Sequence, residues 1–484
     1  MTGTDYSNIA DQPWTLRTPV VGLLTPYFPF FDNRFPPSFR RRQEMYAASL
    51  AERVRRMGFE VAHSGLIDSE AAGREAGSEL REARAEVVLV APTMACPPTY
   101  TLPALDLSPA TPVILVQDQR LPAGDRRYSE LVATEYSNLL GCVMIGNALR
   151  RSGREYAVLP AGDGHDDDSL ARAVRGAAAA ASLHGLRIGR IGQPIPGYLD
   201  GVVDAATAAR LGVTWTEIPT RHLVDAMAAV REPELDRVRA RLGRQGLPVA
   251  PIEGDAALQS FRLCSVLARA ARDHDVSALT INCHGPEFRQ NDQIGVCGCL
   301  AASLLAGEGV PVACTGDAAT TISLMVASRL GGIGQYCEAY LLERVSGELL
   351  LGSCGLGDAR LAAAANPPLI RPNTVYGGVL GDGYSLYLGL PAGPATIISF
   401  TPAGPQSRPT LVAGYGVLSG RSYEEMVGPN GTFRFAADPV ESVLEWNRIA
   451  PAHHLALTLG LISPELRAFA RFAGVDLVEI GDPN

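Results

Sequence analysis

Short apolar runs alternate with longer, helix-like segments along the first third of the chain. The runs that predict buried strands are residues 20–24, 59–62, 86–90 and 112–116. In the segment 38–57, apolar residues recur at helical spacing, which predicts a helix after the first strand. Strands that alternate with helices are typical of parallel βαβ units, so we expect a doubly wound sheet.

Ligands of such sheets bind beyond the carboxyl ends of the strands. The segments at those ends are residues 25–28, 92–96 and 117–119. Tyr27 and Cys96 lie in two of them, and we count both among the candidate substrate contacts.

A second α/β set begins near residue 180. Its predicted strands are residues 187–192, 279–283 and 310–314, the last two ending in a cysteine followed by polar residues. The segment 292–306 predicts a helix between these two strands, and 318–330 predicts another after the last strand.

The pattern changes after about residue 345, where Gly, Pro and Thr become frequent. Short alternating strands such as 396–400 replace the long helices and predict an antiparallel β domain or barrel. A helix at 464–473 and a strand at 475–480 close the chain.

These patterns predict an α/β protein with two doubly wound parallel-sheet domains, followed by a mainly antiparallel, barrel-like C-terminal domain. The predicted domains are residues 1–180, 181–345 and 346–484, the last including the terminal helix. A chain of 484 residues is too long for one hydrophobic core, which agrees with about three domains.

Composition and charge exclude several classes of function. A formal net charge of −9 argues against a nucleic-acid partner, because binding to phosphate backbones needs clustered Lys and Arg. The chain has no uncharged apolar stretch of about 18 residues and no apolar core near its N-terminus. We therefore expect neither a membrane span nor a secretion signal. Nine scattered cysteines without a paired framework indicate a reducing compartment, so we expect a cytoplasmic protein.

Two local motifs could bind a metal but have simpler explanations. The spacing of Cys297 and Cys299 is wrong for a usual zinc site, and their helix-like segment favours buried structural thiols. The Gly/Asp-rich loop 162–168 lacks the spacing of an EF-hand, and acidic loops of this kind are usually solvated.

A distributed group of polar residues is more informative. Asp317 follows a strand and opens a helix, where it is as well explained by helix capping as by ligand binding. Glu338 sits in an apolar, aromatic segment but could also lie on the surface of an edge strand. His453 and His454 are adjacent, and neighbouring residues of a strand point to opposite sides, so we expect only one to face a given site.

The order of these segments resembles the L-fucose/L-arabinose isomerase superfamily over residues 18–484. The segments that carry the resemblance are residues 91–96, 135–138, 162–168, 282–288, 309–317, 338, 353–355 and 453–454. The resemblance implies the same fold of two doubly wound domains and a barrel-like domain. It also implies aldose–ketose isomerisation through an enediol, with a divalent metal, usually Mn²⁺, and carboxylates that move the proton.

The resemblance further implies roles for individual residues and an assembly. Glu338 matches an acidic ligand of the family and His454 its final histidine, so these two are the candidate metal ligands. The candidate catalytic residues are Glu338, Asp317 and Thr315. The candidate substrate contacts are Tyr27, Cys96, His284, Glu287, Ser353, Cys354 and His453. Members of the family are often trimers or hexamers with a site completed by a neighbour, so we expect a homo-oligomer whose site lies near a subunit interface.

The chain departs from the family at two positions: Thr315 stands where the family has Glu, and Ser353 stands where it has His. One carboxylate and one imidazole would hold a hard cation poorly. Either Glu287, Asp317 or His284 compensates and the protein remains a sugar isomerase, or the scaffold serves metal-free chemistry on a sugar-like substrate.

Our leading hypothesis is an isomerase-like enzyme acting on a monosaccharide or sugar derivative, with Glu338 as base and His454 as metal ligand or electrophile. The alternatives are a metal-independent lyase or epimerase on a sugar-derived intermediate, in which Cys354 or Cys314 could assist, and a non-catalytic sugar-binding module.

Overall fold

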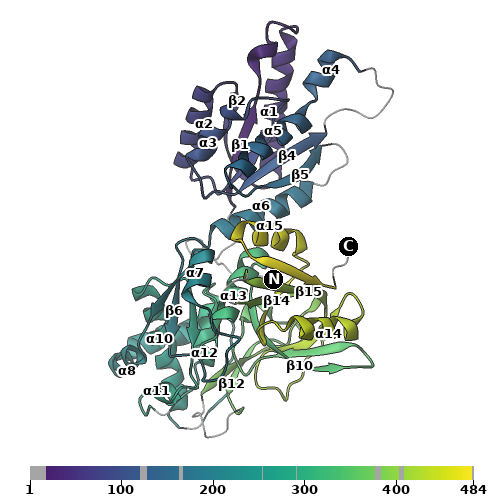
Figure 1. Ribbon diagram of the computed structural model, residues 1–484. Helices are drawn as coiled ribbons and strands as arrows, with labels where there is room; N and C mark the ends of the chain where they lie inside the picture. Colours follow the sequence, from purple (N-terminus) through teal and green to yellow (C-terminus); the bar gives the residue numbers. More distant parts are fainter. Residues whose placement is uncertain are drawn as a thin grey trace. The chain divides into compact units, whose positions relative to one another are not determined.

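The computed structural model describes residues 18–119, 128–162, 167–252, 254–289, 291–375, 383–402 and 408–481 (Figure 1). Contacts between residues divide this part of the chain into two compact units. We call residues 18–182 with Pro464–Gly474 the N-terminal unit, and Leu183–Ser463 with residues 475–481 the barrel unit. Whether the barrel unit comprises two separate domains, as the sequence suggests, stays a prediction.

The N-terminal unit is built on one parallel sheet. Its strands, in the spatial order β2-β1-β3-β4-β5, are β1 (Val20–Pro26), β2 (Glu60–Ile67), β3 (Val87–Val90), β4 (Val113–Gln119) and β5 (Ala157–Gly162). All neighbouring pairs run parallel. The apolar runs expected to form buried strands do so, and the parallel βαβ organisation of this region is confirmed.

Helices cover both faces of this sheet. The helices of the unit are α1 (Ser38–Arg56), α2 (Glu70–Glu82), α3 (Leu102–Asp106), α4 (Glu130–Glu135), α5 (Asn138–Arg151), α6 (Asp167–Ala181) and α15 (Ser463–Ala473). On one face, α1 and α6 pack against alternate residues of β1, β3 and β4. On the other face, α2, α3 and α5 pack against the remaining residues of those strands. Buried strands of this kind have no polar face, which explains their continuous apolar sequence.

Helix α15 comes from near the end of the chain but packs in the N-terminal unit. The Glu465 carboxylate pairs with the Arg172 guanidinium of α6 at 2.9 Å, and Phe472 packs on the apolar core beneath α6. Gly176 of α6 lies so close to α15 that a Cβ there would be 2.2 Å from the Glu465 carbonyl oxygen. The local pattern predicted the helix but gave no sign of where it packs.

The barrel unit contains a second parallel sheet of four strands. In spatial order, its strands are β7 (Thr214–Glu217), β6 (Arg187–Ile191), β8 (Ala278–Ile281) and β9 (Val312–Ala313). Its helices are α7 (Ala205–Leu211), α8 (Thr220–Ala229), α9 (Glu232–Arg244), α10 (Ala256–Asp273), α11 (Pro286–Arg289), α12 (Cys299–Gly307) and α13 (Ala318–Gly331). Three of the strands were expected, whereas β7 was not.

The helix predicted at residues 292–306 is wrong in its first half, because α12 begins only at Cys299. Gly295 has a positive φ of 59°, which interrupts a right-handed helix, and Gly298 is the residue before the first turn. Cys297 therefore lies outside the helix in which the sequence pattern placed it.

The C-terminal part forms a closed barrel. Its six strands are β10 (Gln335–Glu343), β11 (Glu348–Gly352), β14 (Ala392–Thr401), β15 (Thr410–Ser419), β16 (Asn430–Phe435) and β17 (His454–Leu459). The ring β14-β17-β10-β11-β16-β15 closes through antiparallel pairing of β15 with β14. The expected antiparallel, barrel-like region is confirmed, although its first strand begins before residue 346.

Smaller elements complete the barrel region. Strand β18 (Asp476–Ile480) adds to β15 in parallel, β12 (Leu369–Pro372) pairs with β13 (Tyr384–Tyr387), and α14 is Pro439–Ile449.

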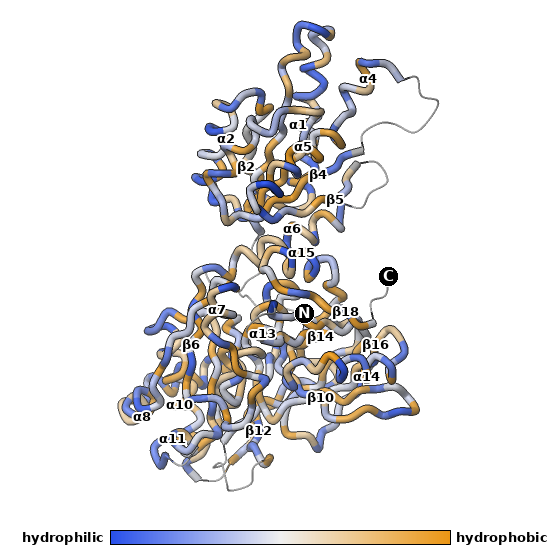
Figure 2. The backbone as a smooth tube through the Cα atoms, viewed as in Figure 1, coloured by the Kyte–Doolittle hydropathy of each residue, from blue (hydrophilic) through white to orange (hydrophobic). Residues whose placement is uncertain are grey.

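The apolar stretches in Figure 2 follow inner strands such as β4 and β14. Helix α13 contacts both β9 of the parallel sheet and β14 and β17 of the barrel, and almost all of its residues are buried. Among the described helices, none combines the length and the apolar character needed to cross a membrane.

Replacing Gly176 with alanine should destabilise the protein by roughly 1–3 kcal/mol, because the new methyl group would collide with backbone that cannot move aside. Gly243, in α9, has no atom within 4 Å of the position of a Cβ, so Gly243→Ala should instead stabilise by up to about 1 kcal/mol. Chemical denaturation of the two variants measures both effects. Equal stabilisation by both substitutions would contradict the packing of α6 against α15.

Candidate functional site

Three polar residues from distant parts of the chain meet where α13 packs against the barrel. Glu338 lies on β10, His454 is the first residue of β17, and Asp317 precedes the first turn of α13. Strands β10 and β17 pair antiparallel with Glu338 directly opposite His454. Opposite residues of such a pair project from the same face, so the strand register brings the two side chains together.

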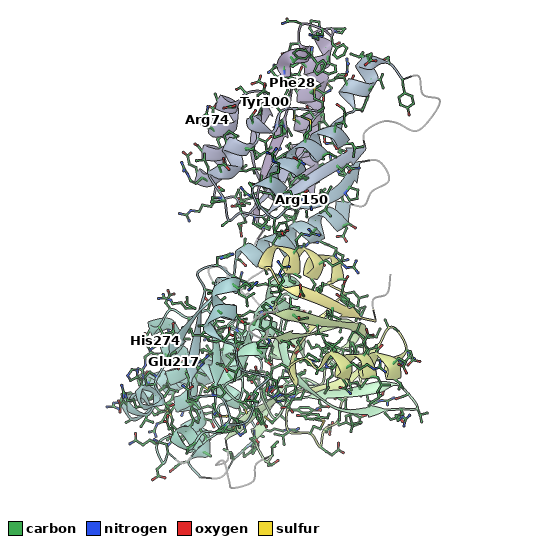
Figure 3. The ribbon with its side chains drawn as sticks, viewed as in Figure 1. Phe28, Arg74, Tyr100, Arg150, Glu217 and His274 are labelled. Carbon is green, nitrogen blue, oxygen red and sulfur yellow. The ribbon has the colours of Figure 1, made fainter. Side chains whose placement is uncertain are left out.

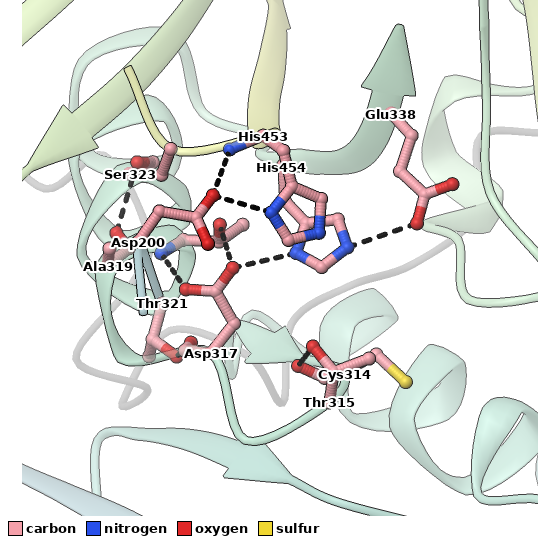
Figure 4. A network of polar contacts seen from close by, with 12 residues as sticks. Asp200, Cys314, Thr315, Asp317, Ala319, Thr321, Ser323, Glu338, His453 and His454 are labelled. Carbon is pink, nitrogen blue, oxygen red and sulfur yellow. Dashed lines mark hydrogen bonds and ion pairs between the residues drawn. The ribbon is translucent and has the colours of Figure 1, made fainter. Parts of the chain in front are cut away.

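The three side chains form a continuous line of contacts (Figure 4). The Nδ1 atom of His454 is 2.7 Å from an Asp317 carboxylate oxygen, and its Nε2 atom is 3.0 Å from a Glu338 carboxylate oxygen. The side chains of His454 and Asp317 are 1% and 2% exposed, whereas that of Glu338 is 29% exposed. Only Glu338, the outer end of the line, is substantially open to solvent.

Asp317 holds the inner end of this line in a fixed position. Its carboxylate accepts hydrogen bonds from the backbone N–H of Thr320 at 2.8 Å and from the Thr320 hydroxyl at 2.7 Å. The backbone of Gly201 also comes close, with its carbonyl accepting from the N–H of Ala318 at 2.9 Å. Helix capping and contact with His454, which the sequence left as alternatives for Asp317, therefore occur together.

His454 carries a positive charge at neutral pH. Burial by itself lowers the pKa of His454, but the hydrogen bonds to Asp317 and Glu338, together with their charges, outweigh burial and raise it to about 9. In the charged form both ring nitrogens donate, which suits a carboxylate on each side.

Two tyrosines of β10 lie near Glu338: Tyr336, two residues before it on the same face of the strand, and Tyr340, at an irregularity in the pairing of β10 with β11. The Tyr336 ring lies 4.9 Å from the ring of His454, between centroids. The Tyr340 hydroxyl is within hydrogen-bonding reach of Glu338, and burial, the charge of Glu338 and this hydrogen bond raise the pKa of Tyr340. Sequence reasoning missed both residues, although strand alternation could have indicated Tyr336.

The adjacent side chains of His453 and His454 do not point to opposite sides, contrary to what strand alternation predicts. The ring centroids of His453 and His454 are 3.8 Å apart, because His453 precedes β17 and does not follow its alternation. The Nδ1 atom of His453 is 2.6 Å from a carboxylate oxygen of Asp200, which also accepts from its backbone N–H at 2.9 Å. Burial by itself raises the pKa of Asp200, but the hydrogen bonds from His453 outweigh burial. The pKa of Asp200 is therefore lowered. No feature of the sequence singled out Asp200.

The two positions where the chain departs from the isomerase pattern do not present metal ligands. The Thr315 hydroxyl donates to the Cys314 carbonyl oxygen at 2.7 Å, and the Ser353 hydroxyl donates to the Leu356 carbonyl oxygen at 2.7 Å. Thr315 has a positive φ of 60°, which is unusual for a β-branched residue and costs on the order of 1–2 kcal/mol.

A hard cation of the Mn²⁺ type therefore does not fit the residues around Glu338. Such ions take about six oxygen or nitrogen ligands, with several anionic oxygens among them. Of the two candidate metal ligands, Glu338 and His454, the imidazole has a carboxylate on each ring nitrogen.

The other candidate residues have varied surroundings. His284 is half-buried, with its Nε2 atom 3.9 Å from the sulfur of Cys314. Glu287 is exposed on α11, and Cys354 is partly exposed just after β11. The substrate-binding roles proposed for these residues stay predictions.

Tyr27 and Cys96 belong to the N-terminal unit, where both are buried. The hydroxyl of Tyr27 hydrogen-bonds Asp32, and the next residue, Phe28, meets Tyr100 edge to face with 6.3 Å between ring centroids (Figure 3). Cys96 lies in an apolar core, where burial raises its pKa to about 12. Substrate contact by Tyr27 and Cys96 stays a prediction.

The acidic loop lies largely outside the described residues, which resume at Asp167. The Asp167 carboxylate accepts from the Arg53 guanidinium at 2.6 Å.

Comparisons with known proteins identify no family for this chain. No family model matches it, and no curated protein matches it. One solved structure with some similarity is a solute-binding protein of an ABC transporter from Burkholderia multivorans, 11% identical, covering 66% of this chain and 95% of that one, with a TM-score of 0.14. At that score the likeness carries no argument about fold or function.

The free energy of unfolding should fall as the pH rises through the mildly alkaline range. Folding raises the pKa of His454 from 6.5 to about 9, so the folded state binds its proton more tightly. The resulting stabilisation, at most about 3 kcal/mol, is fully present below pH 6.5 and is lost as the pH rises to about 9. Urea unfolding of the wild type and of His454→Gln over this range measures it. Identical slopes for the two proteins would contradict a charged imidazole here.

Proposed function

We propose that the protein is an enzyme that acts on a monosaccharide or sugar derivative by enediol-type proton transfer, with Glu338 as the base. The class of reaction is aldose–ketose isomerisation or a close relative of it. The contact between Glu338 and His454, residues 116 apart in the chain, carries the proposal. The resemblance to sugar isomerases requires these two side chains to share one site, and unrelated residues would rarely be so placed.

Glu338 has the position and exposure of a general base. It is the partly exposed end of a line whose other members are buried, which supports contact with a substrate while the remainder stays fixed. A base of this kind takes the proton from the carbon next to the carbonyl and returns it to the former carbonyl carbon, while the hydroxyl proton passes from one oxygen to the other, so that one carbon of the sugar is oxidised and the other reduced.

The charges of Asp317, His454 and Glu338 favour this proton transfer. With His454 protonated, the two carboxylates and the imidazolium carry a net charge of about −1. Uptake of the substrate proton by Glu338 removes this charge while the enediolate gains one, so the total charge of the site is unchanged. The Tyr340 hydroxyl, close to Glu338, is a neutral donor for an oxygen of the enediolate.

A metal-independent lyase or epimerase acting on a sugar-derived intermediate is the second candidate. The neutral, internally bonded Thr315 and Ser353 favour it, because they stand where the isomerase pattern has metal ligands. A non-catalytic sugar-binding module remains the third alternative.

The proposal extends to architecture and assembly. We infer that the two parallel sheets belong to separate doubly wound domains, as the isomerase fold implies. The scattered cysteines support a cytoplasmic location, and the resemblance implies a trimer or hexamer with the site near a subunit interface. Sedimentation analysis of the purified protein tests the assembly.

Incubation of the protein with candidate aldoses and ketoses in deuterated water distinguishes the three functions. An isomerase incorporates deuterium and forms the partner sugar, an epimerase incorporates it with inversion at one carbon, and a lyase forms smaller carbonyl products. A binding module changes none of the sugars. Binding of a sugar without exchange or turnover would overturn the proposed function.

Glu338→Gln should reduce the exchange rate by roughly 10²–10⁴-fold, because an amide cannot accept the proton. The substitution keeps the shape of the side chain, so the melting temperature should change little. Glu425→Gln alters an exposed glutamate of the same unit and serves as the control with unchanged activity. Full activity of Glu338→Gln would exclude this residue as the base.

Thr315→Glu should raise the affinity for Mn²⁺ by at least about tenfold if the site has the geometry of an isomerase site, since each added carboxylate strengthens binding of a hard cation. Thr315→Gln is the matched control, with the same shape and no charge. Calorimetric titration with Mn²⁺ measures both. An equal affinity in the two variants would show that position 315 does not face the metal position of the family.

A further inference from the structure

A second group of side chains with ligand chemistry lies close to the candidate site. Cys283, His284 and Cys314 each offer one ligand atom, and these atoms all lie within 4.8 Å of one another. Both cysteines are 4% exposed, and His284 is half-buried. The proton-transfer line of Asp317, His454 and Glu338 does not use any of them.

The parallel sheet of the barrel unit brings these residues together. Strands β8 and β9 are neighbours, with Thr280 opposite Ala313. Cys314 comes directly after β9, and Cys283 comes two residues after the end of β8. The two thiols therefore lie at the carboxyl edge of adjacent strands, where parallel sheets bind their ligands.

The distance between Cys314 and His284 is close to that of a tetrahedral metal site. Zinc binds sulfur at about 2.3 Å and histidine nitrogen at about 2.0–2.1 Å, so a sulfur and a nitrogen of one tetrahedron are separated by about 3.6 Å. The sulfur of Cys314 is 3.9 Å from Nε2 of His284. A shift of a few tenths of an ångström, as in an ordinary rotamer adjustment, would bring both atoms onto one ion.

A fourth sulfur lies beside the group. The Cys354 thiol is within hydrogen-bonding reach of the Cys314 thiol. The three-residue group does not depend on it.

We propose that Cys283, His284 and Cys314 form a site for a soft, thiophilic cation, with Zn²⁺ as the representative ion. Two thiolates and a neutral imidazole cancel the charge of a divalent ion, which makes the site suitable for a buried position. Hard ions such as Mn²⁺ prefer oxygen ligands and should be excluded. This site goes beyond the proposed sugar chemistry and does not depend on it.

The test uses Co²⁺ as a spectroscopic substitute for Zn²⁺ in the fully reduced, full-length protein. Thiolate ligation of Co²⁺ produces charge-transfer absorption in the near ultraviolet and strong visible bands typical of tetrahedral ions. We expect both with about one Co²⁺ per chain and their loss when Zn²⁺ displaces it. Absence of thiolate bands in the wild type would overturn the proposal, whatever the enzymatic activity.

Variants then assign the ligands. Cys283→Ser and Cys314→Ser should each weaken Co²⁺ binding by roughly 100-fold or more, because even residues that only support metal ligands change affinity by about 10–100-fold. Cys264→Ala, which removes a buried thiol of α10 in the same unit, should leave the bands unchanged. Bands that persist in both serine variants would overturn the assignment.

A measurement on the wild type covers the case in which these variants fail to fold. Slow alkylation of the native protein, followed by mass spectrometry, reports the reactivity of each cysteine. Zn²⁺ should protect Cys283 and Cys314 and leave the labelling of Cys264 unchanged. Equal labelling of all three with and without Zn²⁺ would contradict the site.

Discussion

A charged imidazole buried between two carboxylates is the interaction on which the candidate site depends. A buried charge is tolerated only when partners satisfy it, and His454 has one partner on each ring nitrogen. Asp317 belongs to the helix that packs on the parallel sheet, and Glu338 belongs to the barrel wall. The pairing therefore joins two layers of the barrel unit. Removal of the buried Asp317 carboxylate would leave the imidazolium without its buried partner, which costs about 3–5 kcal/mol in comparable networks, whereas the partly exposed Glu338 contributes less.

Strand register and helix capping together place these charges. In the antiparallel pair of β10 and β17, a slip by one residue would turn either Glu338 or His454 to the other side of the barrel wall. Closure of the barrel opposes such a slip, because β17 also pairs with β14 on its other edge. Asp317 is fixed separately by its bonds to Thr320. Only Glu338 keeps solvent access, so the rigid part of the network supports the one group that a substrate can reach.

The sequence predicted most helices and strands, but it predicted only some of the contacts between distant parts of the chain. The apolar runs near residues 20, 88 and 114 became central strands because burial on both faces leaves a strong local signal. The helix expected at 292–306 failed at Gly295, where one positive φ outweighs an otherwise helical pattern. The closeness of Glu338 and His454 was expected from the family resemblance alone, since no local pattern encodes it. Asp200 had no signal, because its role arises from a contact with His453, 253 residues away.

The short connection from β9 to α13 explains how two kinds of chemistry lie side by side. It begins with the thiol of Cys314 and ends with the carboxylate of Asp317, and both residues between them are left-handed, with φ of 60° at Thr315 and 75° at Gly316. A side chain at Gly316 would place its Cβ 2.7 Å from the backbone of Pro194, so the turn tolerates only glycine there. The turn directs the Cys314 thiol, a soft ligand, toward Cys283 and His284. It directs the Asp317 carboxylate, a hard ligand, toward His454. A glutamate at position 315 would add a hard ligand to this turn, whereas threonine bonds to its own backbone. The turn thus places the thiol of Cys314 and the carboxylate of Asp317 in two different surroundings within four consecutive residues.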